Sequence, residues 1–127
     1  MLANEITKEN LNSMVVRFYT NILKDETVGA FFIKKFGKDM NNAQWKRHIE
    51  LVSNFWTSIA LPDNEYRGNP FSPDRLLMGI DTHTSGQWFK LFYEVVDGLY
   101  EPELADLLKE RYSVMVGNFM RNLGFVA

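Results

Sequence analysis

Apolar residues recur every three or four positions along several stretches of the chain, which is the spacing of helices with one buried face. The stretch at residues 44–61 shows this spacing most clearly, and Asn41 or Asn42 precedes it as a candidate N-cap. His48 borders the apolar stripe, so its ring should face the interior, where a titratable group needs a partner or a function. We therefore expect this helix to form one wall of a binding site. Its apolar positions are Trp45, Ile49, Val52, Phe55, Trp56 and Ile59.

Two helices are predicted ahead of this stretch. Thr7 is a suitable N-cap for the first one. Tyr19 borders the inner face of that helix, so its ring should be buried and its hydroxyl should need a partner. The second helix spans residues 28–36, with Gly37 as its C-cap. The first inner face carries Leu11, Met14, Val15, Phe18, Ile22 and Leu23, and the short helix carries Phe31, Phe32 and Phe36.

Residues 62–73 form the one long irregular stretch and contain three prolines, which predicts consecutive turns. A long loop of this kind in a small domain more often has a function than not. Ser72 and Pro73 then favour a short helix to about Gly79. Two further helices begin at residues 82–85 and 101–102. No strand pattern, hairpin or internal repeat is visible, so the fold class is all-α and residues 1–127 form one domain. The last two inner faces are Trp88, Leu91, Phe92, Val95, Val96 and Leu99, then Leu104, Leu107, Leu108, Tyr112, Met115, Val116, Phe119 and Leu123, closed by Gly124.

The chain is rich in aromatic residues for a small domain. Apolar residues make up 46% of the chain and aromatic residues 14%, enough either to fill a core or to line a cavity for a flat apolar ligand. The net charge of −2 does not favour nucleic acid or an acidic membrane surface as a partner. A small cationic cluster is interpreted as a solvated face, and comprises Lys34, Lys35, Lys38, Lys46 and Arg47.

Several chemistries are excluded by the residues present. The chain has no cysteine, which rules out disulfides, thiolate catalysis and cysteine-ligated metals. No nucleophile elbow or H-E-x-x-H motif indicates a hydrolase, so enzymatic activity stays undecided. No signal-peptide pattern and no apolar run of roughly 20 residues is present, and we expect a cytoplasmic protein.

Six short motifs share an order that points to one family, because their succession is more specific than any single motif. They are F-Y at Phe18–Tyr19, a Phe at Phe32, W-x-x-H at Trp45–His48, N-F-W at Asn54–Trp56, Y-x-G-x-P at Tyr66–Pro70 and W-x-x-L-F at Trp88–Phe92. In this order and spacing the chain resembles the truncated haemoglobins, and among them the third group.

The resemblance implies a shortened globin fold of two helices over two, holding haem b for binding or reducing small diatomic gases. Tyr19, His48 and Trp88 correspond to the distal pocket that hydrogen-bonds an iron-bound ligand, and Phe32 to the Phe on the haem face. A phenol, an imidazole and an indole are suitable donors, because bound dioxygen carries partial negative charge. The implied haem contacts are Tyr19, Phe32, His48, Val52, Phe55, Tyr66, Leu77, Trp88 and Phe92.

One position departs from the family pattern. The proximal histidine of the family follows the N-P step by four residues, and the same count from Asn69–Pro70 gives Asp74 here. The identity of the iron ligand therefore stays open. A carboxylate would favour iron(III) over iron(II). Three outcomes are open. Either haem is bound weakly by apolar contacts, or the site no longer holds haem. Otherwise the iron is held by distal His48 alone or by an unusual ligand, for which the candidates are Asp74, Tyr19, Met78 and a shifted His83.

The leading hypothesis is a haem protein that binds a diatomic gas such as O2 or NO, with peroxide or nitric oxide chemistry as a weaker variant. The rival hypothesis is a haem-free globin-fold module that binds a small apolar ligand or a protein partner. A monomer and a homodimer both stay open, because the sequence does not disclose the oligomeric state.

Overall fold

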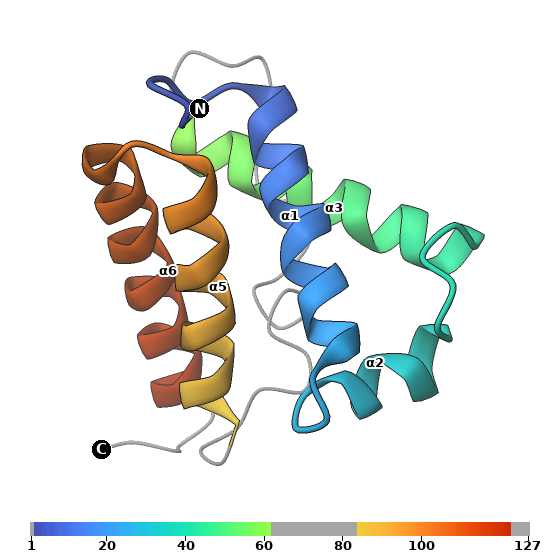
Figure 1. Ribbon diagram of the computed structural model, residues 1–127. Helices are drawn as coiled ribbons and strands as arrows, with labels where there is room; N and C mark the ends of the chain where they lie inside the picture. The colour runs from blue at the N-terminus through green and yellow to red at the C-terminus, as the bar shows by residue number, and fades with distance from the viewer. Residues whose placement is uncertain (1, 62–83, 123–127) are drawn as a thin grey trace.

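The computed structural model describes residues 2–61 and 84–122, without the side chains of residues 118–122. The predicted loop and short helix of residues 62–79, and the end of the last helix at Gly124, lie outside the described residues. Within the described ranges the chain forms helices and no strand, as predicted (Figure 1). The helices are α1 (Lys8–Lys24), α2 (Gly29–Phe36), α3 (Ala43–Ala60), α5 (Ser85–Leu99) and α6 (Pro102–Asn122).

Local side-chain chemistry determines where these helices begin and end. Thr7 caps α1 through a reciprocal pair of hydrogen bonds with Asn10, at 2.9 and 3.1 Å. Asn42 caps α3 by accepting the Trp45 backbone N–H at 2.8 Å. Gly37 ends α2 with a φ of 89°, a left-handed value that glycine adopts at little cost. These predicted helix boundaries are confirmed.

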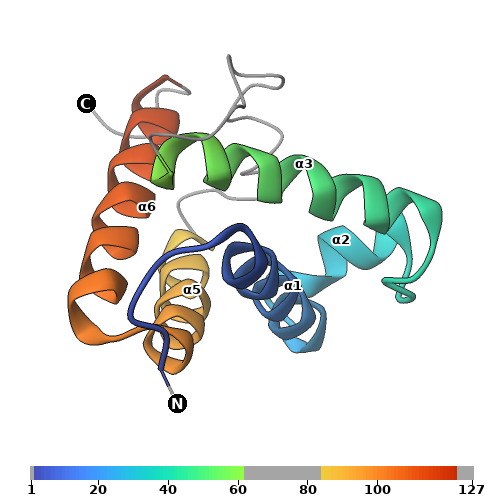
Figure 2. The ribbon, with the colours of Figure 1, turned by 90° about the horizontal axis from the view of Figure 1, so that it is seen from above.

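Helix α1 is the centre of the arrangement. It packs against α2, α3 and α5, and α5 packs in turn against α6. Figure 2 shows α3 lying across α1, while α5 and α6 run beside each other. The result is two helix pairs, α1 with α3 and α5 with α6, that enclose one core between them.

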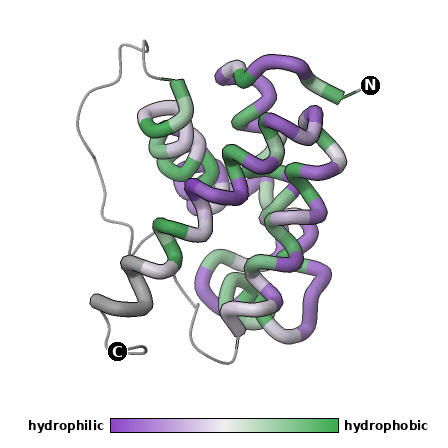
Figure 3. The backbone as a smooth tube through the Cα atoms, turned by 90° about the vertical axis from the view of Figure 1, so that its left-hand side faces the viewer, coloured by the Kyte–Doolittle hydropathy of each residue, from purple (hydrophilic) through white to green (hydrophobic). Residues whose placement is uncertain are grey.

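The buried face of each helix follows the predicted period closely. Hydrophobic and hydrophilic segments alternate along the helices (Figure 3), and Trp45, Trp88 and Tyr19 are among the largest fully buried side chains. The prediction for Leu107 was wrong, because this side chain is 37% exposed. The buried stripe of α6 runs instead through Ala105, Leu108, Tyr112 and Val116. None of the described helices is long and apolar enough to cross a membrane.

The start of the chain is joined to the turn between α5 and α6. Ala3 donates its N–H to the Leu99 carbonyl and accepts from the Glu101 N–H, each at 2.9 Å. The Tyr100 hydroxyl donates to Asn10 Oδ1 at 2.8 Å. These three bonds hold the first turn of α1 against the α5–α6 connection, which closes the core at this end.

Candidate functional site

The His48 imidazole lies in an aromatic cluster where α1, α2 and α3 meet. Its side chain is 6% exposed, so the expectation that it faces the interior is confirmed. The Tyr19 ring lies 4.9 Å from the imidazole and the Phe36 ring 5.1 Å, measured between ring centroids. Trp45 and Phe32 are slightly farther away, at 5.9 and 6.1 Å. Three helices therefore surround one titratable ring with aromatic surface.

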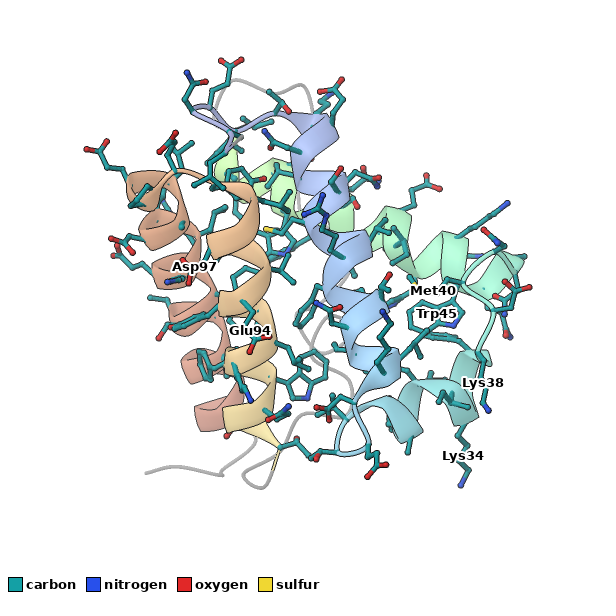
Figure 4. The ribbon with its side chains drawn as sticks, viewed as in Figure 1. Lys34, Lys38, Met40, Trp45, Glu94 and Asp97 are labelled. Carbon is teal, nitrogen blue, oxygen red and sulfur yellow. The ribbon has the colours of Figure 1, made fainter. Side chains whose placement is uncertain are left out.

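The connection between α2 and α3 fixes one side of this cluster. The Trp45 indole N–H donates to the Gly37 carbonyl at 2.9 Å, and the Asn42 side chain donates to the Phe36 carbonyl at 2.7 Å. Figure 4 shows Trp45 in the angle between α1, α2 and the start of α3. The two bonds satisfy backbone oxygens at the end of α2. They also hold the Trp45 and Phe36 rings in place beside His48.

Burial determines the charge of His48. Removal of water lowers the pKa of His48 to about 4, and the nearby charge of Lys35 lowers it further in the same direction. The ring is therefore neutral at pH 7 and carries one N–H. Its Nε2 is buried and has no hydrogen-bond partner among the residues that the structure describes. A buried polar atom of this kind is costly unless a ligand or water uses it.

Tyr19 and Trp88 bring two further polar groups to the same region. Tyr19 is 1% exposed, and burial raises the pKa of its phenol, which stays a neutral donor. Trp88 is also 1% exposed, with its ring 5.7 Å from Phe18 and 5.8 Å from Phe32. Its Nε1 is buried and has no acceptor within the described part of the chain. The fold thus gathers the three groups that the sequence analysis singled out.

A small cavity of about 20 Å³ lies beside these groups, between α1, α3, α5 and α6. Four of the predicted contact residues line it, namely Tyr19, Val52, Trp88 and Phe92. His48 and Phe32 do not line it, although their rings lie 4.9 and 5.5 Å from the Tyr19 ring. Tyr19 therefore belongs to both the His48 cluster and the cavity.

The remaining predicted residues stand apart from this arrangement. Phe55 is buried beside Trp56, with 6.4 Å between ring centroids, and does not line the cavity. Tyr66, Leu77 and Asp74 lie outside the described residues, as do Met78 and His83.

Tyr112 was not singled out from the sequence as a candidate site residue. The periodic pattern placed it on the inner face of the last helix, and it lines the cavity as a buried phenol. Its hydroxyl has no hydrogen-bond partner in the described ranges. No signal in the sequence indicates this, because the pattern of apolar positions records which face is buried and not where a hydroxyl points.

A larger hollow lies elsewhere on the described surface. It is a groove of about 570 Å³ between the outer faces of α1 and α3, and it contains neither Tyr19, His48 nor Trp88. Its lining is mixed, with the Asn12 amide donating to the Ser53 hydroxyl at 3.1 Å across the helix pair. Within residues 2–61 and 84–117, no three His, Asp or Glu side chains gather as metal ligands. The cationic cluster of Lys34, Lys35, Lys38, Lys46 and Arg47 is exposed, as a solvated face should be.

Comparison with known proteins relates this geometry to a family. No protein-family model matches the chain. The chain is 25% identical over 118 residues to a group 3 truncated hemoglobin, ctb, of Campylobacter jejuni, which covers 93% of this chain and 91% of that protein. A crystal structure of a group III truncated hemoglobin from Campylobacter jejuni superposes with a TM-score of 0.79 at 25% identity, covering 97% of this chain and 95% of that one.

The fold is that of a truncated haemoglobin. Both matches extend over nearly the whole chain and together support the truncated haemoglobin family. In the truncated-globin arrangement α1 and α3 form one helix pair and α5 and α6 the other, as the two-over-two prediction expected. The cluster of Tyr19, Phe32 and His48 lies where α1, α2 and α3 of this fold meet.

Proposed function

We propose that the chain binds haem b and uses the groups around Tyr19 to bind a small diatomic gas. One observation carries the proposal. The Nε2 atom of His48 and the Nε1 atom of Trp88 are both buried, and neither has a hydrogen-bond partner among the described residues. Leaving a buried polar group unsatisfied costs about 1–3 kcal/mol, so two such groups around one phenol favour a polar ligand.

The residues present fit the ligand side of a haem. When bound, haem supplies an iron atom that coordinates a diatomic gas. Tyr19 and Trp88 would donate O–H and N–H hydrogen bonds to the partial negative charge of such a ligand, and neutral His48 would add its single ring N–H. Phe32 packs against Tyr19 at 5.5 Å and against Trp88 at 5.8 Å, which holds these two donors in place.

Which residue would hold the haem iron is a separate question. Asp74 stands at the position where the family has its proximal histidine. A carboxylate is a hard oxygen ligand that suits iron(III) better than iron(II), so an aspartate-ligated haem would be easier to keep oxidised. His48, Tyr19, Met78 and His83 are the other candidates, and all of them can be tested one at a time.

Titration of the haem-free protein with haemin tests the proposal. We expect a saturable, one-to-one change in the Soret band, and a weakened or shifted band in His48→Leu. A spectrum that stays that of free haemin in both proteins would contradict haem binding. Asp74→His should sharpen the ferrous spectrum toward that of five-coordinate imidazole-ligated haem, and an unchanged ferrous spectrum would argue against Asp74 as the proximal position.

The alternative is a haem-free module that binds a small apolar molecule or a protein. The observation in its favour is that the described residues enclose only about 20 Å³ beside Tyr19, far less than the roughly 300–1,000 Å³ of ordinary ligand pockets. The colour of the protein purified after expression with a haem precursor separates the two readings. A red-brown protein supports the haem protein, and a colourless protein that also fails the haemin titration supports the module.

A further inference from the structure

The Tyr112 hydroxyl is a buried polar group for which the proposed gas site has no use. Tyr112 is 2% exposed, and its ring stacks on Phe92 with 4.1 Å between centroids and 12° between planes. The Phe89 ring meets it edge-on at 5.4 Å, and Phe18 lies 6.3 Å away. Aromatic neighbours on three sides fix the ring, so the hydroxyl has little freedom to reach a distant acceptor.

The cavity beside this phenol has the right size for one small molecule. Its volume of about 20 Å³ exceeds the ~10–15 Å³ that a single water molecule needs. Tyr112 and Trp88 line it from α6 and α5, and Tyr19 lines it from α1. The rest of the lining is mostly apolar, with Met14, Val52 and Met115 among the contacts.

The polar groups decide which kind of molecule this space can take. The Trp88 Nε1 and the Tyr112 hydroxyl are both buried without a partner in the described part of the chain, and both can donate. Burial raises the pKa of Tyr112, and the phenol therefore keeps its proton at neutral pH. A guest must accept two hydrogen bonds and must be uncharged, because an apolar lining penalises a charge.

We propose that, in the haem-free protein, the space between α1, α3, α5 and α6 is a binding site for one uncharged, water-sized molecule, held by the Tyr112 hydroxyl and by the Trp88 indole N–H while no gas ligand accepts from it. Water itself meets these requirements, since its oxygen accepts two hydrogen bonds and buried waters usually have two to four polar partners. This site goes beyond the proposed function because it needs no haem. Its lining includes Tyr112 of α6 and does not include His48.

Equilibrium unfolding of the haem-free Tyr112→Phe variant tests the site, because a bound water and an idle hydroxyl predict changes of opposite sign in the unfolding constant. If the hydroxyl holds a bound water, its removal should raise the unfolding constant roughly three- to tenfold, the usual effect of losing one hydrogen bond. If the hydroxyl is idle, its removal relieves a buried unsatisfied group. An unchanged or smaller unfolding constant would therefore overturn the proposal.

Tyr100→Phe is the matched control. Its hydroxyl donates directly to Asn10 Oδ1 at 2.8 Å, so this variant should raise the unfolding constant by a similar factor whether or not the cavity binds anything. A crystal structure at high resolution gives the second measurement. We expect one ordered water within hydrogen-bond distance of both Tyr112 and Trp88, absent in Tyr112→Phe; a direct protein acceptor for the Tyr112 hydroxyl would overturn the proposal. Neither the unfolding measurement nor the crystal structure uses haemin. Failure of the water-site proposal can therefore be told apart from failure of the haem proposal.

Discussion

The imidazole of His48 meets the phenol ring of Tyr19 nearly edge-on, with 4.9 Å between ring centroids and 75° between ring planes. The two residues come from α3 and α1, and both are almost completely buried. Because the contact places a titratable ring against an aromatic edge with little water nearby, it favours the neutral imidazole. The charge state of His48 is therefore coupled to the folding of the helix pair.

The first prediction concerns the pH dependence of stability. The pKa of His48 is about 4 in the folded chain and about 6.5 when unfolded, so the unfolded state binds the proton more readily. The contribution of neutral His48 to the free energy of unfolding is therefore fully present above about pH 6.5. It is lost as the pH falls toward 4, which lowers the free energy of unfolding by up to about 3 kcal/mol. Urea unfolding of the haem-free protein at pH 7, 5.5 and 4 measures it.

His48→Gln is the control for this pH dependence, because it keeps a polar side chain but cannot titrate. Every other titratable residue, His83 included, is present in both proteins, so the difference between the two curves isolates His48. Equal loss of stability with falling pH in the two proteins would contradict the low pKa.

The second prediction concerns Tyr19 in the haem-loaded protein. Tyr19→Phe should speed dioxygen dissociation roughly tenfold, since one lost hydrogen bond of about 1.4 kcal/mol corresponds to that factor. Carbon monoxide, which carries less negative charge, should be affected much less. Stopped-flow ligand replacement measures both rates. Tyr93→Phe is the control, since this ring lies beneath the Lys109 ammonium at 5.0 Å and does not line the cavity beside Tyr19, and it should leave both rates unchanged.

The third prediction compares two glycines. A Cβ added at Gly29 would collide with the backbone carbonyl oxygen of Ile22, which cannot rotate away. Gly29→Ala should therefore destabilise the chain by about 1–3 kcal/mol, as overpacking does. A Cβ added at Gly98 meets nothing within 4 Å, so Gly98→Ala should stabilise α5 by about 0.5–1 kcal/mol. Thermal unfolding of both variants checks the opposite signs, and two shifts in the same direction would refute the close approach at Gly29.

The fourth prediction concerns the start of α1. Thr7→Ala removes one half of the capping pair with Asn10 and should cost about 1 kcal/mol in the free energy of unfolding. Ser13→Ala is the control, because Ser13 is exposed within α1, where alanine is the better helix former. Chemical denaturation should show a loss for the first variant and a neutral or slightly positive change for the second.

Much of the helical framework could be predicted from short stretches of sequence. Thr7 and Asn42 act on backbone groups only three residues away, so their capping role is visible without knowledge of the fold. The inner faces of α1, α3 and α5 were likewise predictable, because a helix buries one stripe with a period of 3.6 residues. The prediction for Leu107 failed because this residue lies at the edge of the apolar stripe of α6. Packing of α6 against α5 decides which edge of that stripe is buried.

By itself, the amino-acid sequence determined the helices, their caps and the kinds of side chain on each inner face, since these depend on contacts within a few residues. Only the tertiary structure brought Tyr19, Phe32, His48 and Trp88 together, because they come from four helices and the crossing of α1 with α3 and α5 sets their distances. It also decided that the Tyr112 hydroxyl has no partner in the described chain. Whether a buried polar atom is satisfied depends on what packs around it, and this environment comes from residues distant in the sequence.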